Sequence, residues 1–209
     1  MPEFRRRSPA FAAVLTIFTV IFASNLPTPL YGVWQAEWGF SSTALTGVFA
    51  VYVLGVLLML PTAGPLSDKL GRRQLMLPGM AFTLVAALVF AAATDLYWLA
   101  LGRFLTGIGT GMVTGAATAA LVELDPCGNR ARAGVISALA FTAGATAGPL
   151  FSALGLRWLP WPMVTSFVPV GLLALATMIV LLRADWPAQL GRQTFRLRHW
   201  RPQRLSIPR

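Results

Sequence analysis

The sequence predicts an all-α membrane protein with six transmembrane helices. Hydrophobic residues make up 56% of the 209 residues and charged residues only 11%, which is more apolar surface than a water-soluble domain of this size can bury. The few charges leave six uncharged intervals, each long enough for the roughly 20 residues that a helix needs to cross a bilayer. The apolar segments are too long for the strands of an outer-membrane barrel.

The six spans are expected to end at glycine, proline and polar residues, and they cover residues 10–30, 42–63, 75–93, 97–121, 133–154 and 164–182. They form one predicted bundle over residues 1–183, followed by a basic cytoplasmic linker or tail over residues 184–209. Asn25 lies near the end of the first span and has two interpretations, a side chain facing a substrate path or a residue hydrated near the boundary. Tyr31, Trp34 and Trp38 are predicted to form an aromatic belt at the outer interface.

Basic residues outside the spans predict the orientation. Six crossings place most of them on one side, namely residues 5–7, residues 64–73, Arg130, Arg132 and the tail from Arg183, and leave Arg157 on the other. Such an imbalance predicts that the crowded side is cytoplasmic, with both termini in the cytoplasm of a cell-membrane protein. The net charge of +10 therefore indicates topology and attraction to anionic lipid, and we expect no nucleic acid, metal or cofactor.

A charged decapeptide between the second and third spans is the most informative segment, and it contains Gly64, Asp68, Lys69, Gly71, Arg72 and Arg73. We predict a short loop at the water boundary, with its two glycines bracketing a tight reversal. The pattern Gly-x-x-x-Asp-Lys-x-Gly-Arg-Arg resembles the loop between helices two and three of major facilitator superfamily transporters. The resemblance implies a cytoplasmic latch that stabilises the outward-open state, in which Asp68 caps a helix of a second half and Arg72 completes a charge relay.

Two arginines and two carboxylates, predicted on the same membrane face, each carry a charge that is unfavourable for the dipole of their own helix. Arg72 and Arg73 begin the third helix, where cations are disfavoured, and Glu123 and Asp125 close the fourth, where anions are disfavoured. We predict that an arginine of the first pair reaches a carboxylate of the second, while Asp68 binds a helix N-terminus elsewhere. The alternative is that the positive-inside bias alone placed the arginines.

The fourth span carries one polar stripe. Arg103, Thr106, Thr110 and Thr114 share a face at 100° per residue. Because an unpaired arginine inside a span is costly, the stripe should face an aqueous cavity or a partner, unless Arg103 reaches the interface along its own side chain. The segment resembles the family's helix-four motif, whose arginine is linked to proton translocation, and the match covers Arg103, Gly107 and Gly111.

Small residues recur every four positions in two spans. Gly107 and Gly111 in the fourth, and Gly144 and Gly148 in the fifth, predict faces on which another helix packs at backbone distance, and Pro149 adds a hinge. The segment around Pro149 resembles, in part, the helix-five motif of exporters and antiporters of the same superfamily. Without that resemblance it indicates packing alone.

The resemblance covers the amino-terminal six-helix half of a transporter that normally has two halves. It implies proton-coupled export of a small organic molecule or drug by alternating access, with a second half or a homodimer completing the carrier. The predicted spans contain no Asp or Glu, so a coupling carboxylate would lie elsewhere. The alternatives are a sugar or metabolite importer and a non-transporting membrane subunit. An intramembrane enzyme is disfavoured because the only histidine, His199, lies outside the spans.

Overall fold

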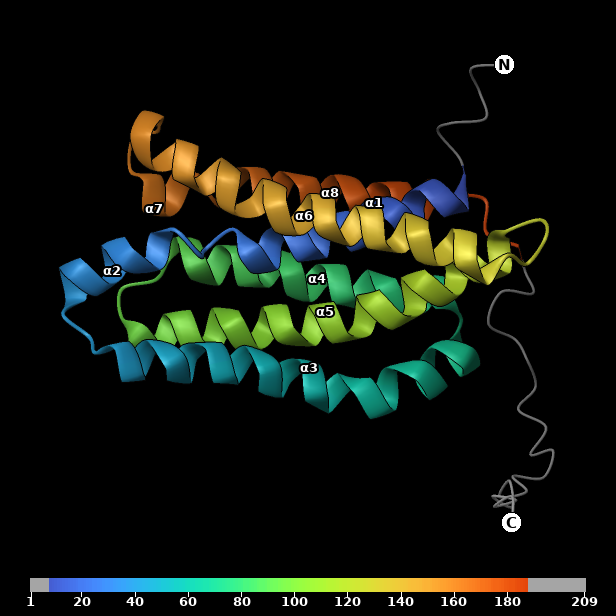
Figure 1. Ribbon diagram of the computed structural model, residues 1–209, viewed down its shortest axis with the longest axis horizontal. Coiled ribbons are helices and arrows are strands. Elements are labelled where there is room, and N and C mark those ends of the chain that lie inside the picture. The colour runs from blue at the N-terminus through green and yellow to red at the C-terminus, as the bar shows by residue number, and fades with distance from the viewer. Residues whose placement is uncertain (1–7, 188–209) are drawn as a thin grey trace, which may run out of the picture.

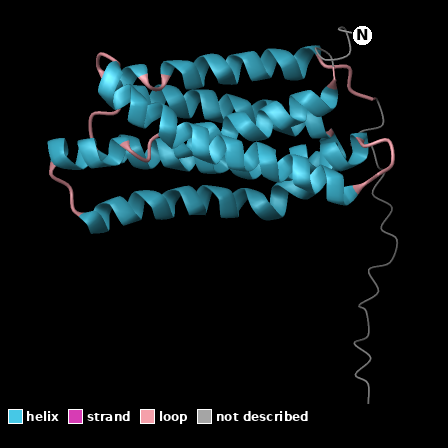
Figure 2. Cartoon of the chain, turned by 45° about the horizontal axis from the view of Figure 1, so that its top comes forward, coloured by secondary structure: helices cyan, strands magenta, loops and turns pink. Residues whose placement is uncertain are grey.

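The computed structural model describes residues 8–187, and within this range it consists of helices and connecting turns with no strand (Figures 1 and 2). The helices are α1 (Pro9–Asn25), α2 (Leu30–Trp38), α3 (Ser42–Leu70), α4 (Arg72–Ala91), α5 (Leu96–Leu124), α6 (Arg130–Trp158), α7 (Pro162–Thr165) and α8 (Val168–Arg183). Two spans are interrupted, so that α1 and α2 together form one and α7 and α8 another. The described residues thus contain six segments long and apolar enough to cross a membrane, which confirms the predicted all-helical six-span class.

The first span breaks after Asn25 and continues as α2. Pro27 and Pro29 lack the backbone N–H that an uninterrupted helix would use, and the Asn25 amide donates to the Ile21 carbonyl at 2.9 Å. Asn25 therefore satisfies a carbonyl at the end of its own helix. Beyond the break, Tyr31 and Trp34 are only 2% and 1% exposed.

The predicted aromatic belt is wrong for these two residues. Trp34 stacks on Phe90 of α4 and on Phe167, the residue before α8, with ring centroids 6.5 and 6.3 Å apart. The break turns α2 so that its aromatic face packs on the end of the bundle. Aromatic side chains in a sequence do not distinguish such an internal stack from a lipid-facing girdle.

The connection between α3 and α4 is shorter than predicted. Residues from Gly64 to Leu70 are helical, and Gly71 alone separates the two helices. Gly71 has φ 111°, a conformation that residues with a Cβ rarely adopt, so a single glycine reverses the chain. The charged residues need no loop, because long side chains on the last turn of a helix reach water directly.

Helix α5 lies at the centre of the bundle and packs on α1, α3 and α4, while α6 packs mainly on α1 and α8 lies on α4 and α1. Helices α5 and α6 touch only sparsely, and Figure 1 shows them close together only toward the right-hand end of the bundle. The start of α1, the α3–α4 connection, the α5–α6 connection and the end of α8 lie at one end of the bundle, on the right in Figure 1. We call this the clamp end.

Both predicted glycine faces are close helix contacts. A Cβ added to Gly107 would lie 2.3 Å from the Tyr52 carbonyl oxygen of α3, and one on Gly111 would lie 2.6 Å from the Met59 Cβ. On α6, added Cβ atoms at Gly144 and Gly148 would each lie 2.6 Å from a carbonyl oxygen of α1. These glycines are required for the α3–α5 and α1–α6 contacts, and α6 continues through Pro149 without ending.

Candidate functional site

Arg72 holds the clamp end together. It is the first residue of α4 and its side chain is 12% exposed. Its Nη2 lies 2.6 Å from Glu123 Oε1 of α5 and its Nε donates to the same oxygen at 3.2 Å. Its Nη1 lies 2.5 Å from Asp68 Oδ1 and donates to Ser67 Oγ at the end of α3. We call Arg72, Asp68, Ser67 and Glu123 the Arg72 clamp; it joins α3, α4 and α5.

Of the two carboxylates predicted as partners for the arginines, Glu123 forms the ion pair with Arg72, whereas the predicted placement of Asp68 is wrong. Asp125 does not join the Arg72 clamp: its Oδ1 accepts from the backbone N–H groups of Cys127 and Asn129 at 2.9 and 3.2 Å, and Arg132 lies 3.8 Å from its Oδ2. Asp68 contacts Arg72 in its own neighbourhood instead of a distant helix N-terminus. In both cases a partner a few residues away is reached at a smaller cost in chain entropy than a distant one.

The carboxyl of Asp125 stabilises the turn between α5 and α6. The hydrogen bonds from Asn129 and Cys127 favour its charged form, so they lower its pKa from the usual value, with Arg132 adding to the effect. The sequence signal for this role is an acidic residue followed by a glycine, a combination typical of turns. In the structure that glycine, Gly128, adopts a left-handed conformation.

Arg73 contacts a different helix from Arg72. Its Nη2 donates to the Leu182 carbonyl oxygen at 2.9 Å, on the last turn of α8. A cation at the carboxyl end of a helix is favourable for the helix dipole, so Arg73 offsets the unfavourable position it has at the start of α4. Consecutive arginines thus tie α4 to α5 and to α8.

Arg103 is buried near the opposite end of α5, with 4% exposure. Its Nε donates to the Tyr31 hydroxyl and its Nη1 to the Ser24 carbonyl oxygen. The guanidinium carbon lies 5.0 Å from the ring centroids of Tyr31 and Phe49 and 5.8 Å from that of Tyr52. Within residues 8–187 no carboxylate forms an ion pair with it. The prediction that Arg103 faces a partner therefore holds, and the alternative of a side chain extending to the interface is wrong.

The threonines of the predicted stripe bond mainly to their own helix. Thr106, Thr110 and Thr114 each donate to a carbonyl three or four residues earlier, at 2.7–2.9 Å. Thr110 is also 2.9 Å from the Ser24 hydroxyl of α1. Thr106 and Thr110 are thus buried packing residues, and only Thr114 borders a cavity.

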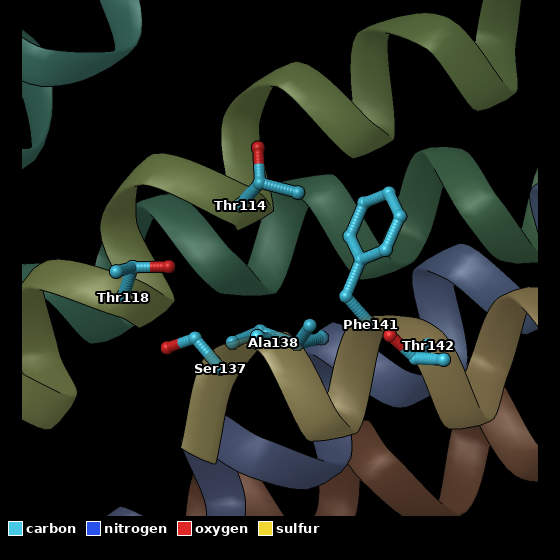
Figure 3. Close-up of a pocket in the computed structure, with 7 residues that line it drawn as sticks. Thr114, Thr118, Ser137, Ala138, Phe141 and Thr142 are labelled. Atoms are coloured by element: carbon cyan, nitrogen blue, oxygen red, sulfur yellow. The ribbon is translucent and has the colours of Figure 1, made fainter. Parts of the chain in front are cut away.

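That cavity lies between α5 and α6, over α1, and has a volume of about 280 Å³. We call it the hydroxyl pocket. Figure 3 shows Thr114 and Thr118 on α5 across the gap from Ser137, Ala138 and Phe141 on α6, with the Phe141 ring projecting toward α5. The lining residues are Ile17, Thr114, Thr118, Ser137, Ala138, Phe141 and Thr142. Apart from Thr114, sequence reasoning gave no reason to select them, because hydroxyl side chains are common in membrane helices and no spacing distinguishes a pocket from a packed face.

The sequence profile of the Major Facilitator Superfamily matches residues 13–206. The chain belongs to this superfamily. Members of this superfamily are membrane transporters and not enzymes, and the described residues of this chain supply six segments long and apolar enough to cross a membrane.

Individual relatives agree with the family. The chain is 32% identical over 145 residues to the gallate transporter of Pseudomonas putida, covering 69% of this chain and 32% of that protein. It is 28% identical over 175 residues to the chloramphenicol resistance protein CraA of Acinetobacter baumannii, covering 81% and 41%. The human organic anion transporter MFSD10 superposes with a TM-score of 0.58 and 27% identity, over 87% of this chain and 47% of that one. The facilitator chain thus spans less than half the length of each.

Of the predicted site residues, the structure brings together Asp68, Arg72 and Glu123. The side chains of Asn25 and Asp125 bond within their own segments. The predicted basic tail over residues 184–209 lies outside the described residues beyond position 187.

Proposed function

We propose that this facilitator chain forms one six-helix half of a secondary active transporter that exports a small organic molecule by alternating access. The hydroxyl pocket is the observation that carries the proposal. It is a cavity of about 280 Å³ on the sparsely packed side of α5 and α6, where a second bundle would cover it.

The Arg72 clamp supports a gating role at one end of that pocket. Glu123 lies five residues after Thr118 on α5, about 7.5 Å along the helix axis at 1.5 Å per residue. The Asp68 side chain is 49% exposed and that of Glu123 29% exposed, so water can replace their ion pairs at modest cost. We propose that the Arg72 clamp closes the cytoplasmic end and opens during the cycle.

The charge distribution supports a cytoplasmic clamp end. Lys69, Arg72, Arg73, Arg130 and Arg132 all lie there, and Arg157 lies at the other end of α6. By the positive-inside bias, the clamp end, where α1 begins and α8 ends, faces the cytoplasm.

The partner of this bundle would be a second six-helix bundle, either another chain or a second copy. Support comes from the length of the relatives, because the matched part of this chain covers only 32%, 41% and 47% of theirs. Proton coupling would use a carboxylate of that partner, because Arg103 is permanently charged and cannot carry a proton at physiological pH. A relative named for chloramphenicol resistance favours export of an organic molecule.

The test is movement of radiolabelled chloramphenicol in proteoliposomes, with and without an imposed pH gradient. Both the single chain and a tandem fusion of two copies are reconstituted. We expect gradient-dependent movement, lost in Ala138→Phe, which fills the pocket, and retained in Ala143→Phe, an exposed position on the same helix that does not line it.

The outcomes separate the alternatives. Movement only in the tandem fusion supports two cooperating bundles. The second candidate is an importer, which is supported by the relative named as a gallate transporter. Inward movement of gallate in preference to chloramphenicol would favour it. No movement of either compound in either preparation contradicts transport and favours a non-transporting subunit.

A further inference from the structure

We infer that the hydroxyl pocket selects an uncharged small molecule that carries one planar ring and a hydrogen-bond acceptor. This inference rests on the proposed transport function and names the substrate class of the same site. It follows from three properties of the lining: its charge, its unused hydrogen-bond donor and its size.

The lining carries no ionisable side chain. Four of the seven residues are hydroxyl-bearing, namely Thr114, Thr118, Ser137 and Thr142, and the others are Ile17, Ala138 and Phe141. An ion that enters an apolar cavity loses its hydration and needs a counter-charge or several strong dipoles in return. Arg72, the cation of the nearby clamp, is already paired with Asp68 and Glu123. An uncharged occupant avoids this penalty.

Ser137 provides an unused donor. Its Oγ is buried and has no hydrogen-bond partner among residues 8–187. This is unusual in the bundle, because helical hydroxyls such as Thr114, Thr16 and Thr177 donate to a carbonyl four residues earlier at 2.6–2.8 Å. A buried hydroxyl without a partner is unfavourable, and a ligand acceptor would remove that cost. Figure 3 shows the hydroxyls of Ser137 and Thr118 on facing sides of the gap between α6 and α5.

The size and the apolar walls favour a single ring. A volume of about 280 Å³ is at the small end of ligand pockets, which run from about 300 to 1,000 Å³. Ile17 is 2% exposed and forms a fixed apolar wall, whereas Phe141 is 47% exposed and its ring can pack edge-on or offset against another aromatic ring.

The test compares three single-ring probes of similar size and different charge: benzamide (neutral), benzoate (anionic) and benzylammonium (cationic). Binding to the purified full chain in lipid nanodiscs is measured by ligand-observed NMR titration at pH 7. We expect benzamide to bind at least about tenfold more tightly than either ion, since each ion would be desolvated without a partner. Ser137→Ala should weaken benzamide binding about fivefold, the loss of one neutral hydrogen bond, and Thr118→Val should weaken it in the same direction.

Ser166→Ala is the matched control. Ser166 Oγ is also buried and unpaired, but it lies beside Gly155, away from the pocket, so its loss should leave benzamide affinity unchanged. Circular dichroism checks that each variant keeps its helix content. Equal or tighter binding of benzoate or benzylammonium overturns the inference, as does unchanged affinity in Ser137→Ala or the absence of binding by all three probes.

Binding and transport fail independently in this design. Neutral-selective binding without movement in proteoliposomes would contradict the proposed transport function and leave the ligand class intact. Movement of an organic molecule together with tighter binding of a charged probe would contradict the inferred ligand class and leave the proposed transport function intact.

Discussion

Arg103 and Arg72 of this facilitator bundle are stabilised in opposite ways. Arg103 is 4% exposed and surrounded by a hydroxyl, a carbonyl and three aromatic rings, with no ion pair among the described residues. Arg72, at the clamp end, contacts two carboxylates and a serine hydroxyl near water. One cation is held by packing and the other by charge.

The difference predicts which contact can change during a transport cycle. Opening the Arg103 site would strip a cation of its aromatic and backbone partners inside a span, a cost of several kcal/mol. Opening the Arg72 clamp exchanges its ion pairs for water at a place where the two carboxylates are already 49% and 29% exposed, so it should cost less. We therefore expect movement at the clamp end and rigidity around Arg103.

The largest effect should come from removing the backbone contact that holds α3 against the Arg103 site. Gly107→Leu places a branched side chain where even a Cβ would lie 2.3 Å from the Tyr52 carbonyl, so α3 must move away. We expect the free energy of unfolding to fall by about 3 kcal/mol or more. Denaturant unfolding in detergent micelles measures it.

Gly115→Leu is the control for this substitution, because nothing lies within 4 Å of a Cβ added there. It should change the free energy of unfolding by less than about 1 kcal/mol. The change should be an increase, because leucine has a better helix propensity than glycine. Similar losses at both glycines would show that Gly107 is not a close contact.

The same arginine-to-lysine exchange should have unequal effects at the two sites. Lysine has one nitrogen in place of the separate Nε and Nη1 that reach Tyr31 and Ser24, and it is more strongly hydrated than arginine, so Arg103→Lys should cost about 2 kcal/mol. Arg72→Lys can still pair with Glu123 or Asp68 and should cost less than about 1 kcal/mol. Thermal unfolding of both variants in one detergent decides this, and a larger loss for Arg72→Lys would invert the comparison.

A smaller effect is expected when the clamp loses a charge. Glu123→Gln removes the ion pair with Arg72 but keeps a hydrogen-bond acceptor, so it should reduce stability by about 0.5–1 kcal/mol at low salt. Raising the salt concentration should reduce the gap between the native chain and the variant, since salt screens exposed charges. A gap that does not depend on salt would mean that Glu123 acts through packing.

The smallest effect concerns the α5–α6 turn. Because the folded-state pKa of Asp125 is lowered by backbone hydrogen bonds from Asn129 and Cys127, the stability it contributes is fully present above its unfolded pKa of about 3.9. That contribution is lost as pH falls through the lower folded pKa. Amide hydrogen exchange at Cys127 and Asn129 should therefore speed up in acid, after correction for intrinsic rates. Asp125→Asn should remove this pH dependence.

Sequence reasoning reached the site unevenly. The pairing of Arg72 with Glu123 followed from the signs of the helix dipoles and from a shared membrane face. Both can be derived from the order of residues along the chain. The choice between Glu123 and Asp125 stayed open in the sequence, and the structure decides it because backbone N–H groups of a local turn occupy the Asp125 carboxylate. Tyr31 was assigned to a lipid interface, since residue type alone does not show that the break after Asn25 turns α2 onto the bundle.

The sequence by itself determined the membrane class, the number of spans and the glycine faces, because hydropathy and small-residue spacing depend on residues near one another in the chain. Only the tertiary structure decided that Arg103 is enclosed by aromatic rings from two other segments and that Ser137, Thr118 and Phe141 surround a cavity. Those features depend on the distance between helices, which is set by how closely α5 and α6 each pack on α1.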